Sequence, residues 1–324
     1  MKRIVIFLIG CAMLVALTWY AGAGAVAQAF VTLGAGGLLV VSLIHLPTVA
    51  LAGIAWWAVG RDVPGAARWK FVAARLMRNA AGEVLPFSQL GGFAVGVRVL
   101  VLWGVKLFRG SLSLFADLVM EFAGKFPYAV IGIALVYAVQ PRSGLLGPLA
   151  LGAGLTAACV APVVVFRGRL MDLLERYALK LVRRWTSLAP SADVRPAIAA
   201  VFAADRLAVC FAVHFVAWLM GAVETWAIFA LMGSPVTLLE AVVIDSLVGG
   251  LKTFVFLVPA AAGVQEGAYV LVCALFGMGP APAVAFSLIR RAREFVLGVP
   301  ALVIWQLMEA RAPAAREALR ETTP

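Results

Sequence analysis

The sequence predicts an all-α polytopic membrane protein with about six full transmembrane helices and two re-entrant, broken-helix hairpins in an inverted-repeat architecture. Of its 324 residues, 64% are hydrophobic and 13% are charged, and several apolar runs exceed the roughly 18–20 residues that a spanning helix needs. Two Pro/Gly-interrupted stretches, one in each half, predict the hairpins. Ionisable residues inside apolar runs are expensive in a bilayer and therefore indicate function.

The interrupted stretch of the second half covers residues 258–269. Between two apolar runs it contains Pro259, Gly263, Gln265, Glu266 and Gly267. In hydrocarbon every backbone N–H and C=O needs a partner, so a broken helix is tolerated only inside protein or beside water. A carboxylate at such a break predicts a substrate site. The alternative is an extramembrane loop with an acidic cap.

The first half has a similar stretch at residues 85–92. Its backbone-breaking and polar residues are Pro86, Gln89, Gly91 and Gly92. The apolar runs that follow the two breaks, 91–104 and 267–279, would rise only roughly 20 Å, less than the ~30 Å of hydrocarbon. Paired short, interrupted segments in two halves of a chain predict a transporter site at the interface between inverted repeats.

We expect one transmembrane domain, residues 1–308, with a short tail at 309–324. Its halves, 1–166 and 207–308, are joined by a cytoplasmic amphipathic linker at 167–206. The full spans are predicted at 4–20, 35–60, 111–139, 145–166, 207–232 and 283–308. The first of these is expected to be an uncleaved span, and the alternative is a signal peptide.

Charge placement predicts the orientation. The net charge of +11 would suggest a nucleic-acid partner in a soluble protein, but here the positive residues gather at the ends of apolar runs, so no nucleic acid is expected. The basic segment 61–80 places the N-terminus in the cytoplasm, and the last span returns the C-terminus there. We predict a multi-pass protein of the bacterial inner membrane. The basic amphipathic segment 167–187 is expected to lie on anionic lipid, or else to bind a partner protein.

Metal and cofactor chemistry is not expected. The four cysteines lie alone in apolar runs, and the two histidines are far apart in the sequence. These cysteines are Cys11, Cys159, Cys210 and Cys273. Without a CxxC or HExxH pattern, free buried thiols are the simpler expectation. His45 is expected to be a satisfied core or interfacial histidine.

Two spans carry charges at depths where they need partners. Glu224 should face the bundle interior, either in a site or in a structural hydrogen bond. The last span contains Arg290, Arg291, Arg293 and Glu294. Each Arg costs on the order of 2.5–3.5 kcal/mol at the bilayer centre. An aqueous cavity, pairing of Glu294 with Arg290, or a bound phosphate could offset that cost. Alternatively, the helix begins near Ala292.

The span 111–139 carries three charges at its start. Asp117, Glu121 and Lys125 are four apart and share one helix face, with Glu121 and Lys125 in the favourable order for an ion pair. The alternative is a helical turn that precedes the hydrocarbon.

The second interrupted stretch carries a family resemblance. Pro259, Gly263, Glu266 and Gly267, followed by Arg290, resemble the pattern of the lysylphosphatidylglycerol synthase transmembrane family of flippase-like proteins. The longer string 263–269, with 290–294, is similar to a hopanoid-biosynthesis-associated (HpnL-type) subgroup. Many members have Arg-x-Gly-Glu after the first Pro. At residues 87–92 this chain has Phe-Ser-Gln-Leu-Gly-Gly, which contains no charged residue, so no charged role is transferred to this position.

The resemblance implies a lipid-handling protein that moves lipid between leaflets, and we do not expect an enzyme. The hypothesis is a lipid flippase or lipid-translocating carrier, for hopanoid or another polar or anionic lipid. Arg290 and Arg291, with Arg98, would hold an anionic or hydroxylated head group. Gln89 and Gln265 would donate hydrogen bonds, and Glu266 would pair with a cation or take a proton. The predicted substrate-binding set is Gln89, Arg98, Glu224, Gln265, Glu266, Arg290, Arg291 and Glu294.

Two alternatives stay open. A membrane-embedded lipid-modifying transferase would use the Glu/Arg cluster as base and phosphate clamp, although the sequence contains no recognisable nucleophile, metal triad or nucleotide loop. A non-catalytic scaffold would bind lipid-biosynthesis enzymes through the segment 167–187.

Overall fold

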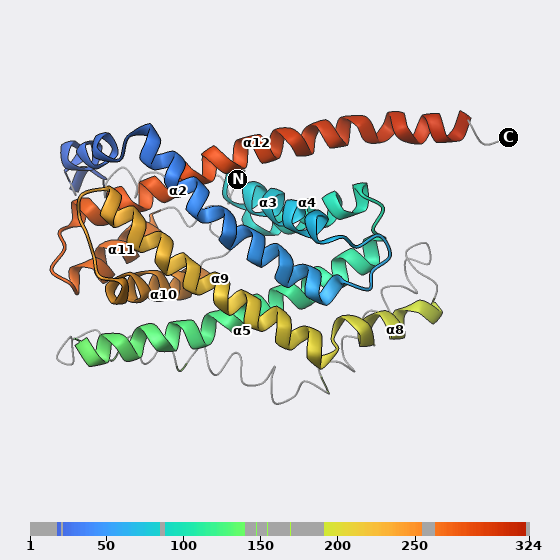
Figure 1. The fold of residues 1–324 in the computed structure, drawn as a ribbon, viewed down its shortest axis with the longest axis horizontal. Helices are drawn as coiled ribbons and strands as arrows, with labels where there is room; N and C mark the ends of the chain where they lie inside the picture. Colours follow the sequence, from blue (N-terminus) through green and yellow to red (C-terminus); the bar gives the residue numbers. More distant parts are fainter. Residues whose placement is uncertain are drawn as a thin grey trace, which may run out of the picture.

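The computed structural model of the chain describes residues 18–20, 22–84, 88–139, 147, 154, 169, 191–254 and 263–321. Within these ranges the regular elements are helices, as predicted (Figure 1). In chain order they are α2 (Ala23–Gly60), α3 (Arg68–Val84), α4 (Ser88–Leu102), α5 (Leu107–Val139), α8 (Ser191–Val201), α9 (Ala204–Leu231), α10 (Leu238–Phe254), α11 (Val264–Ala274) and α12 (Pro280–Glu321).

One order of elements occurs twice. A long helix, a pair of short helices and another long helix follow one another as α2, α3–α4, α5 and again as α9, α10–α11, α12. Figure 1 shows the α3–α4 pair toward one end of the bundle and the α10–α11 pair toward the other. Opposite ends are what an inverted repeat requires.

Within the described residues, four helices are long and apolar enough to cross a membrane. They are the helical segments Ala23–Gly60, Leu107–Ala138, Ala204–Leu231 and Pro280–Ala312. The paired helices are shorter: α4 has 15 residues and α11 has 11, which is roughly 22 Å and 16 Å of helix. The predicted spans 4–20 and 145–166, and the amphipathic segment 167–187, lie outside the described residues except for a few positions.

The structure contradicts some of the predicted backbone breaks and supports another. Gly91 and Gly92 lie inside α4, and Gly267 lies inside α11, so these three residues are helical. Gly92 instead allows close packing, because a Cβ there would come within 2.5 Å of the Arg78 carbonyl oxygen on α3. Gly263 is a break, with a φ of +78° that favours glycine. Pro86 and Pro259 lie outside the described residues.

Each helical pair packs into its own apolar core. The first core joins α3 and α4 to the end of α2 and the start of α5, with Trp56 and Phe71 edge to face at 5.4 Å. The second joins α10 and α11 to α9 and α12, with Phe229 stacked on Phe286 at 4.5 Å. Large apolar side chains such as Leu271 are also exposed on the outside, as expected for a lipid-facing surface.

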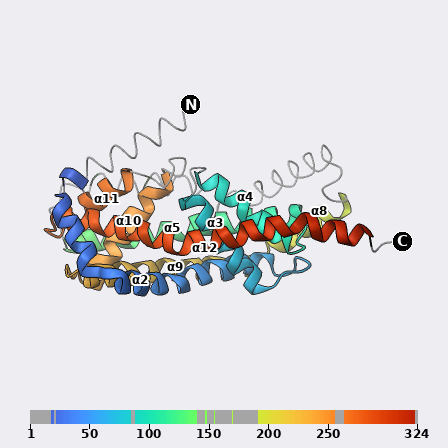
Figure 2. The ribbon, with the colours of Figure 1, turned by 90° about the horizontal axis from the view of Figure 1, so that it is seen from above.

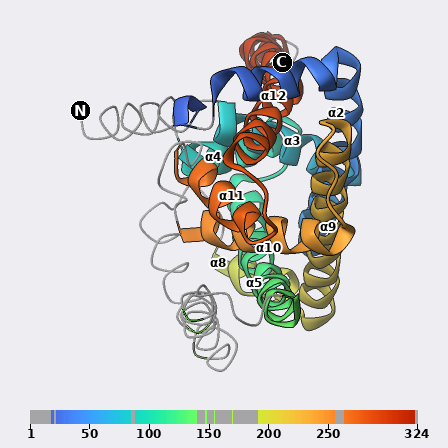
Figure 3. The same ribbon diagram turned by 90° about the vertical axis from the view of Figure 1, so that its left-hand side faces the viewer.

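The helix α12 packs against both pairs of short helices. Figure 2 shows it running along the whole bundle. Its first part packs on α11, and further along, a Cβ at Gly298 would come within 2.7 Å of Val84 at the end of α3. Seen end-on in Figure 3, α2 and α9 lie side by side along one flank, and α10 and α11 lie between α12 and α5. The two halves are therefore tied together by long helices.

Candidate functional site

A buried polar cluster forms where α11 begins. The positive φ of Gly263 turns the chain into α11, and its backbone N–H donates to the Glu266 carboxylate at 2.7 Å. Glu266 also accepts hydrogen bonds from Ser287 at 2.9 Å and from the Arg291 Nε at 2.7 Å. Gln265 donates to the same Ser287 at 3.1 Å. Three donors satisfy a carboxylate that is fully buried, which is what its charge needs there.

Asp245 is the second carboxylate of this region. It accepts hydrogen bonds from Arg290 at 2.8 Å, from the Tyr128 hydroxyl at 3.1 Å and from the Thr225 hydroxyl at 3.2 Å. Arg290 also donates to the Tyr269 hydroxyl at 2.9 Å. These residues come from α10, α12, α5, α9 and α11, so five helices meet at one ion pair. Asp245 was not among the residues predicted from the sequence to form the site.

Glu224 is the third carboxylate. As predicted it faces the bundle interior, with 1% of its surface exposed. It accepts hydrogen bonds from Arg293 and from His45, whose Nδ1 lies 2.8 Å from the carboxylate. Arg293 also donates to Glu294. His45 thus has a buried partner, as predicted for a satisfied histidine, and the contact joins α2 to α9.

We call this set the α12 cluster. It consists of Glu224, Asp245, Glu266, Arg290, Arg291 and Arg293, together with the side chains that bond to them. The helix α12 begins at Pro280, so the arginines lie within it and the alternative start near Ala292 is wrong. Of the possibilities offered for offsetting the arginine charge, direct ion pairing is observed, but the carboxylate hydrogen-bonded to Arg290 is Asp245, and Glu294 accepts from Arg293.

Arg98 does not belong to the α12 cluster. Its guanidinium pairs with Glu309, at 2.7 and 2.8 Å. Positions 290 and 309 are 19 residues apart on α12, roughly 28 Å of helix. The structure therefore brings together six of the eight predicted substrate-binding residues and separates Arg98 from them. The side chain of Gln89 lies outside the described residues.

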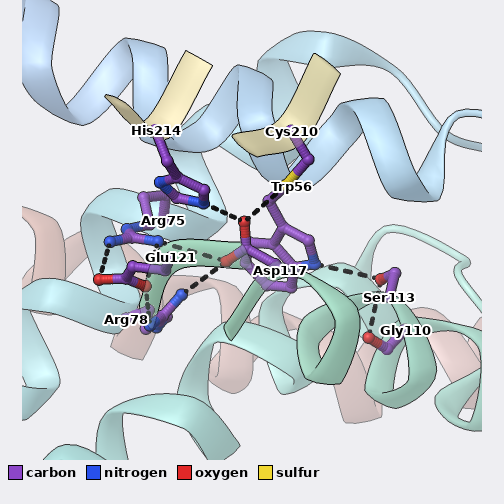
Figure 4. Close-up of polar contacts among 9 residues, drawn as sticks. All are labelled: Trp56, Arg75, Arg78, Gly110, Ser113, Asp117, Glu121, Cys210 and His214. Atoms are coloured by element: carbon purple, nitrogen blue, oxygen red, sulfur yellow. Dashed lines mark hydrogen bonds and ion pairs between the residues drawn. The ribbon is translucent and has the colours of Figure 1, made fainter. Parts of the chain in front are cut away.

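A second buried cluster was not predicted as a site. Figure 4 shows two arginines of α3 facing two carboxylates of α5, with a cysteine and a histidine of α9 above them. We call it the α3 cluster, and its members are Arg75, Arg78, Asp117, Glu121, Cys210 and His214.

The α3 cluster is densely bonded. Arg75 donates two hydrogen bonds to the Glu121 carboxylate, at 3.0 and 3.1 Å. Arg78 bridges Asp117 at 3.0 Å and Glu121 at 2.9 Å. The other oxygen of Asp117 lies 2.8 Å from the His214 Nε2. All five of these side chains are buried or nearly so. Two positive and two negative charges balance, as buried charges require.

Sequence reasoning assigned Arg75 and Arg78 to a basic cytoplasmic segment. The missed signal was their spacing of three, which puts both on one helix face. Glu121 was expected to pair with Lys125. In the structure it binds both arginines, and the Lys125 ammonium lies over the Trp218 ring at 4.6 Å. Asp117 and Glu121 lie within α5 and both are buried in the protein.

Part of the α3 cluster has the spacing of a metal site. Ligand atoms of Asp117, Cys210 and His214 lie within 4.8 Å of one another. However, the second oxygen of Asp117 is held by Arg75 at 3.3 Å and by Arg78. Two guanidinium charges this close oppose a divalent cation. The chemistry fits an ion-pair network better than a metal centre.

The fold and the two clusters define a polytopic helical membrane protein whose interior is organised by paired arginines and carboxylates. The chain belongs to the family of the lysylphosphatidylglycerol synthase transmembrane region, whose model matches residues 6–301. This confirms the family resemblance seen in the sequence and indicates a function related to membrane lipids. No curated protein and no solved structure matches the chain.

Proposed function

We propose that the protein is a lipid flippase, a carrier that moves a polar lipid between the leaflets of the bacterial inner membrane. The α12 cluster is the observation that carries this proposal. It puts three arginines and their carboxylates inside a bundle of apolar helices, beside the short helix α11. Ionisable residues at such a position commonly line substrate paths.

Partial exposure supports a binding role for two of the arginines. The side chains of Arg290 and Arg291 are 21% and 18% exposed, whereas those of their partners Asp245 and Glu266 are 6% and 0% exposed. A head group can therefore approach the guanidinium groups while the carboxylates stay behind them. Arg suits this role because its planar group keeps its charge and can bind two oxygens at once.

The charge balance favours a hydroxylated head group over a purely anionic one. Three arginines of the cluster face four carboxylates: Asp245, Glu266, Glu224 and Glu294. An anion that took an arginine would leave a buried carboxylate unpaired, which is strongly unfavourable. A hydroxyl accepts from the arginine and donates to the carboxylate at the same time. This supports a polyhydroxylated lipid, such as the hopanoid class that the sequence pattern implies.

The test is translocation of a fluorescent glucosyl diacylglycerol, whose head group is polyhydroxylated and uncharged, in proteoliposomes, read by quenching of the outer leaflet. Arg291→Gln keeps hydrogen-bonding capacity and removes the charge opposite Glu266. We expect its rate to fall about tenfold or more, the loss of roughly one strong charged hydrogen bond. Arg98→Gln is the matched control, because it removes an Arg–Glu pair remote from the cluster, and its rate should stay within about twofold of the unmodified protein.

The proposal fails if Arg291→Gln and Glu266→Gln both translocate at the unmodified rate while the proteins are folded. Mass spectrometry of the lipids after incubation separates the alternatives. A covalently altered lipid would support a lipid-modifying transferase, and unaltered lipid with unaltered rates would support a scaffold.

A further inference from the structure

The α3 cluster occupies the same place in the first half as the α12 cluster does in the second. Each lies between a pair of short helices and the long helix that follows it, and each pairs arginines with carboxylates. The signs are exchanged. In the first half the short helix α3 carries Arg78 and the long helix α5 carries Glu121. In the second half α11 carries Glu266 and α12 carries Arg291.

The two clusters lie at different depths on shared helices. On α5, Asp117 of one cluster and Tyr128 of the other are 11 residues apart, and on α9, His214 and Glu224 are 10 residues apart. These separations are roughly 15–17 Å of helix, about half of the ~30 Å hydrocarbon thickness. With α5 and α9 spanning the bilayer in the proposed carrier, a head group that crosses it would pass the level of both clusters.

Each arginine of the α3 cluster has a hydrogen-bond donor without an acceptor among the described residues. The Nε atoms of Arg75 and Arg78 are both buried, and neither donates to an acceptor in the described part of the chain. Buried donors of this kind normally have a partner, so each guanidinium can take a further oxygen. Yet the two side chains are only 7% and 4% exposed, compared with about a fifth for Arg290 and Arg291. This cluster is closed in the present structure.

Two reciprocal ion pairs hold the nearby end of the bundle together. Arg61 donates to Asp205 at 2.8 Å, and Arg206 donates to Asp62. We call these two pairs the clasp. They join the end of α2 to the start of α9, the first long helices of the two halves. Cys210 of the α3 cluster lies on α9 only five positions after Asp205, about 7.5 Å of helix.

We propose that the α3 cluster is a second site for the lipid head group and that the clasp closes it in this structure. The inference rests on the carrier function proposed above, and it adds a site and an entrance. The Arg61–Asp205 pair of the clasp is suited to opening, because its side chains are 42% and 65% exposed. In the other pair Asp62 is 56% exposed and Arg206 is 11% exposed. Ion pairs at such exposure are weak, so lipid binding can shift the equilibrium between closed and open.

The native cysteines report opening without a transport assay. The full chain in phosphatidylcholine nanodiscs is treated with N-ethylmaleimide, and labelling of Cys210 and Cys273 is read by peptide mass spectrometry. Asp205→Arg sets two arginines against each other, and we expect Cys210 to label about five- to tenfold faster. Arg61→Asp combined with Asp205→Arg restores the pair and should restore slow labelling. Cys273, buried in the second core, should not change in either variant.

Two results would overturn the clasp: unchanged Cys210 labelling in Asp205→Arg, or equal acceleration at Cys273, which would mean general loosening. If Asp205→Arg does not fold, Asp205→Asn gives the same test with a smaller expected change.

The second site itself is tested by asking whether lipid protects Cys210 from labelling by N-ethylmaleimide. In Asp205→Arg, nanodiscs that contain glucosyl diacylglycerol should slow Cys210 labelling several-fold, and free glucose should not. Combining this variant with Arg75→Gln and Glu121→Gln, which preserves the charge balance, should abolish the protection. Absent protection in a protein that still translocates lipid refutes the second site alone. Protection without translocation would refute the carrier function and retain the site.

Discussion

Glu266 on α11 and Arg291 on α12 are joined at 2.7 Å, and the same carboxylate holds the backbone N–H of Gly263 where α11 begins. One buried group thus fixes both a helix start and a helix–helix contact. This double role explains why an acidic residue can stand beside a chain break in an otherwise apolar region.

Removal of either member of this pair should be strongly destabilising. Glu266→Ala leaves Arg291 with an uncompensated charge, and we expect a loss of about 3–5 kcal/mol in unfolding free energy. The double variant with Arg291→Ala should lose clearly less than the sum of the single variants, because no charge is left unpaired. Unfolding in mixed micelles with increasing SDS measures all three proteins. Additive losses would show that the two residues do not interact.

Asp117 should be the most sensitive carboxylate of the α3 cluster. Asp117→Asn removes the charge that faces Arg75, Arg78 and His214, and we expect a loss of about 3–5 kcal/mol in unfolding free energy. Cys210→Ala is the matched control in the same place. The cysteine sulfur is 3.9 Å from Asp117, a weak contact, so its loss should cost about 1–2 kcal/mol or less in the same assay. Equal effects would contradict the described network.

Two helical glycines should respond oppositely to alanine. At Gly92 a Cβ would clash with the Arg78 carbonyl at 2.5 Å, so Gly92→Ala should cost about 1–3 kcal/mol of unfolding free energy. At Gly267 a Cβ would meet nothing within 4 Å, so Gly267→Ala should be neutral or stabilise the helix by up to about 1 kcal/mol. Thermal unfolding in detergent compares them. A destabilised Gly267→Ala would restore the idea of a break at that position.

The pair of Arg98 and Glu309 should matter little. Their side chains are 39% and 26% exposed, so solvent screens the attraction. We expect Glu309→Gln to change the unfolding free energy by less than about 1 kcal/mol. Circular dichroism during thermal unfolding is sufficient to test this. A loss as large as that of Glu266→Ala would show that the pair is buried in the folded protein.

The sequence was sufficient for the fold class and for identifying some of the buried charged residues of the α12 cluster. Apolar runs and the two Pro/Gly-interrupted stretches predicted helices and their repeated order, because membrane helices follow from hydrophobic length alone. The isolated carboxylates Glu224 and Glu266 were found for the same reason, since a charge inside an apolar run is conspicuous.

The sequence alone could not show which buried charged residues pair with one another in the folded protein. Asp245 pairs with Arg290 across 45 positions, and Arg75 pairs with Glu121 across 46. Local spacing favoured Glu294 for Arg290 and Lys125 for Glu121, because residues four apart on a helix are neighbours. Tertiary packing supplied other partners, and only the arrangement of five helices determines them. The α3 cluster was missed because its arginines resemble ordinary positive residues at a helix end.

The helix α12 packs against both pairs of short helices, and this has a consequence for membrane integrity. If α12 tilts so that it no longer packs on the short helices at one end of the bundle, its packing on the short helices at the other end must change as well. The two ends are then mechanically linked, so a continuous aqueous pore through the bundle is disfavoured. For the carrier function proposed above, this linkage would let a lipid shift while the proton and sodium gradients across the membrane stay intact.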